Sequence, residues 1–244
     1  MPDIDNESRF IGHLIELRKR LIRSSIAVAI GFAVAYYYSD WLYAVLTKPL
    51  LPAMPKGQEY LVFTGVVEPF FIYMKVGFFG GLVLASPVIF YQIWAFVAPA
   101  LQLKEKAWFL GIVFSSTVLF ITGVLFAYYV VLPFGFIYLL SFATDGLKPM
   151  LSMSDYFSLS TKLLIAFGMT FQLPLAMMVL ARFGLVTAKK FLSWWRYAIV
   201  IIFIVAAVLT PTPDFFNQLL MAAPLIVLYA IGIVTAKIVE RKKD

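Results

Sequence analysis

Two glutamates stand among basic residues beside long apolar segments. Glu16 lies within the segment 13–20 (HLIELRKR), and Glu105 lies between Lys104 and Lys106. A carboxylate can accept two parallel hydrogen bonds from one guanidinium, so a pair of carboxylates could bind two arginines of a partner. The spacing also allows a simpler interpretation, in which Glu16 pairs with Arg20 one helical turn away and the lysines neutralise Glu105. Spacing alone leaves both interpretations open.

Side chains close to these acids in the sequence could complete such a site. Phe96 offers a ring on which a guanidinium can stack, and Leu17 gives Glu16 an apolar flank. No constellation of Ser, Asp or Glu with His13 points to hydrolysis. We therefore predict a binding site and no enzyme. Its predicted members are Glu16, Glu105, Phe96, Leu17, Arg18 and His13.

Polar and proline residues also interrupt the apolar segments. Gln172 and Tyr128 lie within such segments. A polar amide in hydrocarbon needs a partner, so Gln172 either joins two helices through a hydrogen bond or lines a polar groove. We expect a further set of residues to shape helix ends or to contact partners. This set is Pro49, Pro87, Thr210, Pro211 and Asp214.

The composition excludes a soluble globule. Hydrophobic residues make up 62% of the 244 positions and charged residues 14%, with a mean hydropathy of +0.91, whereas soluble domains contain about 25% charged residues. The chain has no Cys and one His, which excludes disulfides and thiolate sites and argues against a metal or other cofactor. The net charge is +7, but the basic residues flank apolar runs and do not form one basic face. We therefore expect no nucleic-acid partner.

The elements that must position these residues are transmembrane helices. We expect an all-α, polytopic membrane protein whose six kinked helices form a concave bundle, within a single domain. The predicted spans are 21–40, 70–98, 108–140, 156–181, 197–209 and 219–236. Prolines inside the spans predict the kinks. The fifth span reaches only about 20 Å against a hydrocarbon core of about 30 Å, and we expect Pro224 to shorten the sixth.

Basic residues are concentrated on one predicted side of the membrane. Lys48, Lys56 and Lys148 are the ones expected on the opposite side, while Lys75 and Lys162 should snorkel to the interface. The bias places both termini in the cytoplasm. The segments that carry the majority of Lys and Arg are 9–23, 104–106, 182–196 and 237–243.

Several segments follow one another in an order typical of one family. They are HLIELR at 13–18, SPVIFYQIWAFVAPAL at 86–101, FAY at 126–128 with Pro133, AFG at 166–168 with Phe171 and Pro174, and TPTPD at 210–214 with Gln218 and Pro224. Together these motifs resemble the TatC family, the multi-spanning core subunit of the twin-arginine protein translocase. The similarity covers nearly the whole chain.

The resemblance implies a receptor in a prokaryotic inner membrane that binds the twin-arginine signal peptides of folded cargo proteins. Export would draw on the proton-motive force. In the family, acids that match Glu16 and Glu105 are implicated in recognising the paired arginines. Single-span partners of the TatA and TatB type, and further copies of the chain, are the implied partners. The family often has Glu where this chain has Gln172 and Ala230, so a proton-carrying acid at these positions cannot apply here.

A secondary transporter is the alternative function class. A proton-coupled secondary transporter of a small solute would show inverted repeats and half-helices that meet near the membrane midplane. The sequence shows neither feature.

Overall fold

The computed structural model describes residues 3–54, 60–63, 65–98, 106–142, 150–210 and 215–240. These parts of the chain are helical apart from short loops, and they contain one isolated parallel bridge, between Val62 and Ser152. The all-α prediction is therefore confirmed.

The helices follow one another along the chain with short connections. They are α1 (Asp3–Tyr37), α2 (Ser39–Thr47), the 3₁₀ helix η1 (Lys48–Ala53), α3 (Glu68–Val97), α4 (Lys106–Phe126), the π-helical turn η2 (Ala127–Val131), α5 (Leu132–Leu140), α6 (Met153–Thr170), α7 (Leu173–Arg182), α8 (Ala188–Ser193), α9 (Trp195–Leu209) and α10 (Phe215–Val239).

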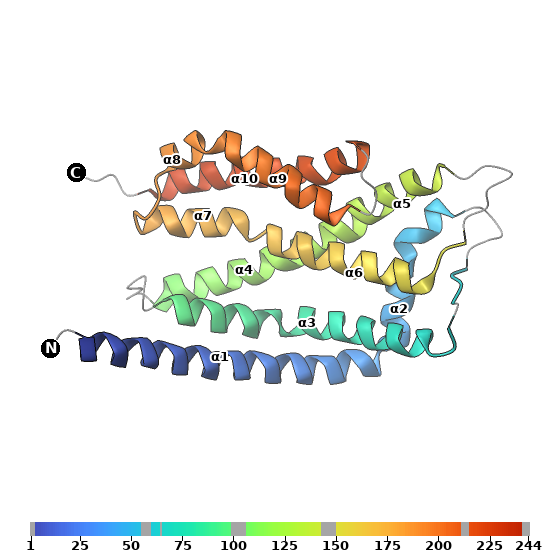
Figure 1. Ribbon diagram of the computed structural model, residues 1–244, viewed down its shortest axis with the longest axis horizontal. Helices are drawn as coiled ribbons and strands as arrows, with labels where there is room; N and C mark the ends of the chain where they lie inside the picture. The colour runs from blue at the N-terminus through green and yellow to red at the C-terminus, as the bar shows by residue number, and fades with distance from the viewer. Residues whose placement is uncertain are drawn as a thin grey trace.

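Five helical stretches are long and apolar enough to cross a membrane, and α9 is a shorter apolar helix. The third stretch consists of α4, η2 and α5, and the fourth of α6 and α7. In Figure 1, α1 and α3 lie side by side at one edge of the bundle, and α9 and α10 lie at the other. Both ends of the chain lie at the same end of the bundle, which an even number of crossings requires.

Glycines allow α1 and α3 to pack at backbone distance. A Cβ atom added to Gly31 would lie 2.6 Å from the carbonyl oxygen of Gly81, and one added to Gly81 would lie 2.5 Å from the Phe32 nitrogen. Small residues at helix crossings serve this purpose in membranes, where close van der Waals contact replaces the hydrophobic effect between helices. The C-terminal part of α1 is thus fixed against α3 by backbone contact.

A second close crossing joins α4 to α6. A Cβ atom on Gly123 would approach the Phe167 carbonyl oxygen to 2.6 Å, and one on Gly168 would approach the Phe120 ring to 2.6 Å. Phe120 and Phe167 are almost fully buried there. Buried aromatic rings therefore form this part of the core, and Gly123 and Gly168 allow α4 and α6 to approach closely around them.

Pro133 and Pro174 lie at the two interruptions of the long helical stretches. Pro133 occupies the first turn of α5, directly after the π-helical turn, and Pro174 occupies the first turn of α7, after the break at residues 171–172. Proline fits the first turn of α7 because its missing N–H would have no intrahelical partner there, whereas at Pro133 the π-helical turn continues directly into α5 and alters the backbone hydrogen-bond pattern where proline lacks a donor. Both prolines were predicted to kink their helices, and both helices are interrupted.

Pro87 and Pro224 lie inside helices that continue through them. The assignment of α3 and α10 is unbroken at these positions, and α10 contains 25 residues. The expected shortening of the sixth span by Pro224 is therefore not observed. One missing backbone hydrogen bond does not end a helix when hydrocarbon penalises every other unpaired backbone group. The predicted shortness of the fifth apolar helix is confirmed, because α9 has 15 residues.

Candidate functional site

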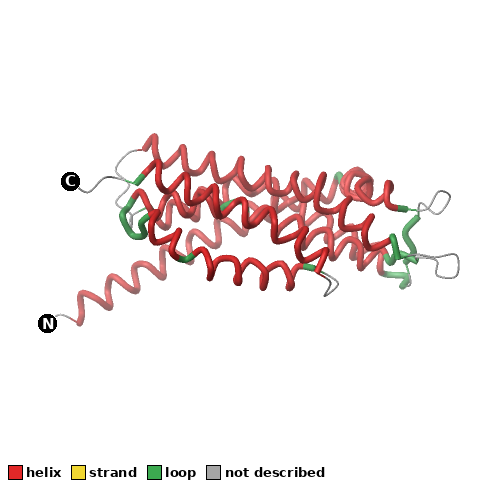
Figure 2. The backbone as a smooth tube through the Cα atoms, turned by 90° about the horizontal axis from the view of Figure 1, so that it is seen from above, coloured by secondary structure: helices red, strands yellow, loops and turns green. Residues whose placement is uncertain are grey.

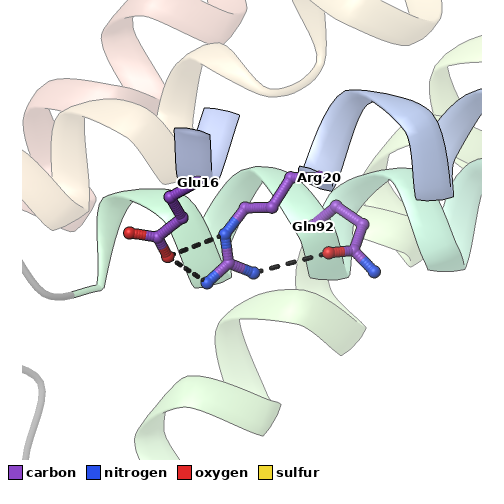
Figure 3. A network of polar contacts seen from close by, with 3 residues as sticks. All are labelled: Glu16, Arg20 and Gln92. Atoms are coloured by element: carbon purple, nitrogen blue, oxygen red, sulfur yellow. Dashed lines mark hydrogen bonds and ion pairs between the residues drawn. The ribbon is translucent and has the colours of Figure 1, made fainter. Parts of the chain in front are cut away.

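An arginine connects the N-terminal part of α1 to α3 through two polar side chains. The Arg20 guanidinium donates to the Glu16 carboxylate from Nε at 3.0 Å and from Nη2 at 2.5 Å. Its Nη1 lies 3.4 Å from the Gln92 side-chain oxygen. Figure 3 shows Arg20 between the two acceptors, with Glu16 on the same helix and Gln92 on its neighbour. The three side chains form one polar network.

Helix geometry explains the pairing. Glu16 and Arg20 are four residues apart, so their side chains lie on one face of α1. Their side chains are 34% and 19% exposed, whereas the other residues from 11 to 19 are exposed. In Figure 2 the N-terminal turns of α1 leave the other helices. Glu16 and Arg20 are thus on the side of these turns that faces α3.

The remaining predicted members of the site lie at the same end of the two helices. His13 and Phe96 meet edge to face, with ring centroids 6.4 Å apart. Leu17 is 45% exposed, and Arg18 is also exposed. The structure therefore brings Glu16, His13 and Phe96 to one region at the α1–α3 contact, with Leu17 and Arg18 on the neighbouring surface of α1. Glu105 lies outside the described residues.

Gln92 belongs to this region and was not among the predicted site residues. Its side chain is only 8% exposed, although its amide is polar. The signal was present in the sequence, because Gln92 interrupts an otherwise apolar run in the same way as Gln172. A buried amide in such a helix needs a hydrogen-bond partner. Arg20 supplies that partner from α1.

This arrangement can bind a guanidinium. The carboxylate of Glu16 already receives two N–H groups from one guanidinium, and a ring, an amide oxygen and an apolar side chain lie nearby. Charge-assisted contacts of this type are short and depend on orientation. No group of three or more His, Cys, Asp or Glu side chains that could hold a metal ion occurs in the described ranges.

A second polar network lies deeper in the bundle. The Trp94 indole N–H donates to the Ser116 hydroxyl at 2.6 Å, and the Gln172 amide donates to the Ser116 carbonyl oxygen at 3.0 Å. Ser116 is fully buried. These bonds join α3, α4 and the break between α6 and α7. They support the interpretation of Gln172 as a link between helices.

The other predicted residues are dispersed. The Tyr128 hydroxyl donates to the Val45 carbonyl oxygen at 2.7 Å and so ties the π-helical turn to α2. Pro49 is buried at the start of η1, and Thr210 follows the last residue of α9. Pro87 is inside α3. Pro211 and Asp214 lie outside the described residues.

Comparisons with known proteins agree with this architecture. The family model "Sec-independent protein translocase protein (TatC)" matches residues 12–224. The chain is 45% identical to the Sec-independent protein translocase protein TatC of Desulforapulum autotrophicum over 98% of this chain and 88% of that protein. It is 37% identical to the protein of the same name from Escherichia coli, over 94% of this chain and 88% of that protein.

A solved structure shows the same fold. The crystal structure of the twin-arginine translocase receptor TatC superposes with a TM-score of 0.83 at 40% sequence identity, covering 94% of this chain and all of that chain. The helical bundle, the matching motifs and the full-length similarity lead to one conclusion: the chain belongs to the TatC family of Sec-independent protein translocase proteins.

Proposed function

We propose that the region around Glu16 binds the paired arginines of twin-arginine signal peptides. As a TatC-family protein, the chain is a core component of the Sec-independent translocase. The observation that carries the proposal is the contact between Glu16 and a guanidinium, in which Nε and Nη2 of Arg20 both donate to Glu16 Oε1. A lysine ammonium is a point charge and cannot reproduce the two parallel N–H groups.

Arg20 has a defined part in this proposal. In the structure it occupies the carboxylate that an arginine of a signal would need. Gln92 gives Arg20 a second acceptor, so Arg20 can stay partly satisfied when a signal arginine takes its place on Glu16. Arg20 then acts as an internal competitor, and binding is an exchange of one guanidinium for another. An exchange of this kind costs little, because neither carboxylate nor guanidinium is left unpaired.

The surroundings of the site fit a peptide that carries both charge and apolar residues. Ile11, Leu14, Ile15 and Leu17 are exposed around Glu16 on the turns of α1 that leave the bundle. The apolar part of a signal could pack along this surface while its arginines reach the acid. We further propose that Glu105 supplies the second carboxylate.

Signal-peptide affinity tests the proposal directly. The full chain, Glu16→Gln, Glu105→Gln and the double variant are compared in detergent or nanodiscs with synthetic Arg-Arg and Lys-Lys signals. Each acid should contribute about a tenfold preference for the Arg-Arg signal, as expected for a charge-assisted hydrogen bond. The double variant should lose the preference for arginine, while its weak Lys-Lys binding changes less.

Glu240→Gln is the matched control. Glu240 is an acid at the same end of the bundle, where its carboxylate accepts from the Ala188 backbone N–H at 3.1 Å. This variant should keep the parent preference. If both Glu16→Gln and Glu105→Gln bind the two signals as the parent does, the acids merely neutralise neighbouring bases and the proposal is wrong.

The orientation and partners form part of the same proposal. The charge bias supports cytoplasmic termini in the inner membrane of a prokaryote, which would place the Glu16 region on the side where signals arrive. The proposed partners are single-span TatA- and TatB-type proteins and further copies of the chain. The proposed energy source is the proton-motive force. The alternative of a small-solute transporter has no support, since the matched relatives are named as protein translocases.

A further inference from the structure

A depression lies between α3 and α6 at the end of the bundle opposite the chain termini. Its outer part, about 560 Å³, is lined by the polar residues Glu68, Ser152, Ser154 and Asp155 together with the apolar residues Val67 and Ile72. Its inner part, about 450 Å³, continues toward the middle of the helices. The lining of this inner part is Phe32, Met74, Phe78, Phe79, Thr161 and Ile165.

Both parts are lined by Phe71 and Lys75, so they adjoin at these two residues, and the polar side chains are concentrated in the outer part. Lys75 stands at the boundary. It lies seven residues after the start of α3, which is about 10 Å along the helix. A lysine at this depth can hold a charged group at the membrane interface while the groove below it stays in hydrocarbon.

The charges around the outer part are of both signs. Lys75 is exposed and donates to the Ser158 hydroxyl at 3.0 Å, which uses one of the three donors of its ammonium. Asp155 is exposed in the first turn of α6. The Glu68 carboxylate accepts from the Ser154 backbone N–H at 2.9 Å and from Gly65 N–H at 3.3 Å, and so forms part of the wall.

We propose that this depression binds a phospholipid with a primary ammonium in its headgroup, of the phosphatidylethanolamine type. One acyl chain fills the apolar groove, the phosphate contacts the Lys75 ammonium, and the lipid ammonium contacts Asp155 on α6. With the termini in the cytoplasm, the lipid belongs to the outer leaflet.

Charge complementarity selects this class of lipid over others. An anionic headgroup without an amine would satisfy Lys75 but would face the carboxylates of Asp155 and Glu68. A choline headgroup carries a cation that cannot donate hydrogen bonds to them. A free phosphate would leave the apolar groove unfilled. Only a zwitterion with a donating ammonium matches both ends of the polar part.

Native mass spectrometry of the detergent-purified full chain tests the proposal. The protein is titrated with dioleoyl phosphatidylethanolamine, phosphatidylglycerol and phosphatidylcholine. The parent should bind phosphatidylethanolamine best. Lys75→Met should weaken its binding about fivefold, the size expected for one exposed charge-assisted contact. Asp155→Asn should reduce the preference for phosphatidylethanolamine over phosphatidylglycerol by about threefold.

Lys48→Met is the matched control, because Lys48 is another exposed lysine at this end of the bundle and does not line the depression. It should bind lipid as the parent does. Equal binding of the three lipids by the parent, or unchanged binding by Lys75→Met and Asp155→Asn, overturns the proposal.

A photo-crosslinker at Ile165, at the inner part of the depression, distinguishes a lipid from a protein occupant in native membranes. Adducts with phosphatidylethanolamine support the proposal. Adducts with protein alone would show that a partner helix fills the groove, and would also overturn it.

Discussion

The C-terminal part and the N-terminal turns of α1 differ in how closely the rest of the protein holds them. At Gly31 the helix meets the backbone of α3, with no room for a methyl group. At Gly12 nothing lies within 4 Å of an added Cβ atom, and the neighbouring side chains are exposed. One continuous helix is therefore anchored in its C-terminal part and accessible at its N-terminal end. A helix held in this way can keep Glu16 at a fixed position relative to the bundle while leaving it accessible.

The largest effect should come from breaking the anchor. Gly31→Ala places a Cβ atom 2.6 Å from the Gly81 carbonyl oxygen, so one helix must shift. Overpacking of this kind costs about 2–3 kcal/mol of unfolding free energy. Gly12→Ala makes the same chemical change in the same helix without a clash, and should be neutral or stabilising by up to about 1 kcal/mol. Denaturant unfolding of the full chain in detergent measures both variants. Equal stabilities would mean that the close crossing is not an anchor.

A smaller effect should come from removing the internal competitor at the accessible end. Arg20→Gln leaves Glu16 without its guanidinium, so the affinity for an Arg-Arg signal should rise by up to about fivefold, the scale of an exposed ion pair. Arg23→Gln is the control, because Arg23 is exposed on the same helix and its removal changes the net charge equally. A fall in affinity for Arg20→Gln alone would show that Arg20 orients Glu16 instead of competing with a signal.

The smallest effect should come from the bond between the Gln172 amide and the Ser116 carbonyl oxygen. Gln172→Leu removes a single interhelical hydrogen bond, and such bonds contribute about 0.6 kcal/mol on average in membranes. Unfolding free energy should fall by this amount, while signal-peptide affinity stays at the parent value. A clear loss of affinity in a variant of normal stability would instead support the earlier alternative, in which Gln172 lines a groove.

The sequence predicted the class of fold because hydrocarbon imposes strong constraints on composition. Long apolar runs have to form helices in hydrocarbon, and basic segments alternate with these runs. The helical class of the fold could therefore be predicted from the sequence. A kink at Pro174 was predicted, and the structure shows a full break there, after which the proline fits the first turn of α7. The prediction that Pro224 would shorten the last helix was wrong, because a proline inside an apolar helix leaves the remaining backbone hydrogen bonds intact.

The site was predicted only in part. The i,i+4 spacing of Glu16 and Arg20 was readable, and their contact is present. Gln92 was missed because its role depends on α1 lying against α3, and that juxtaposition follows from the backbone contact at Gly31 and Gly81. The spacing of residues within one helix does not show which residues of a neighbouring helix it will contact.

The length of α9 has a consequence for the lipid around it. Its 15 residues extend about 22 Å, whereas the hydrocarbon core of a bilayer is about 30 Å thick. Side chains along one face of α9, including Tyr197, Val200, Ile204 and Val208, are exposed. If α9 crosses the bilayer, acyl chains in contact with this face must compress or tilt to match it, at a cost of fractions of a kcal/mol for each Å of mismatch. We therefore expect an elastic distortion of the bilayer on this flank of the protein, present before any cargo arrives.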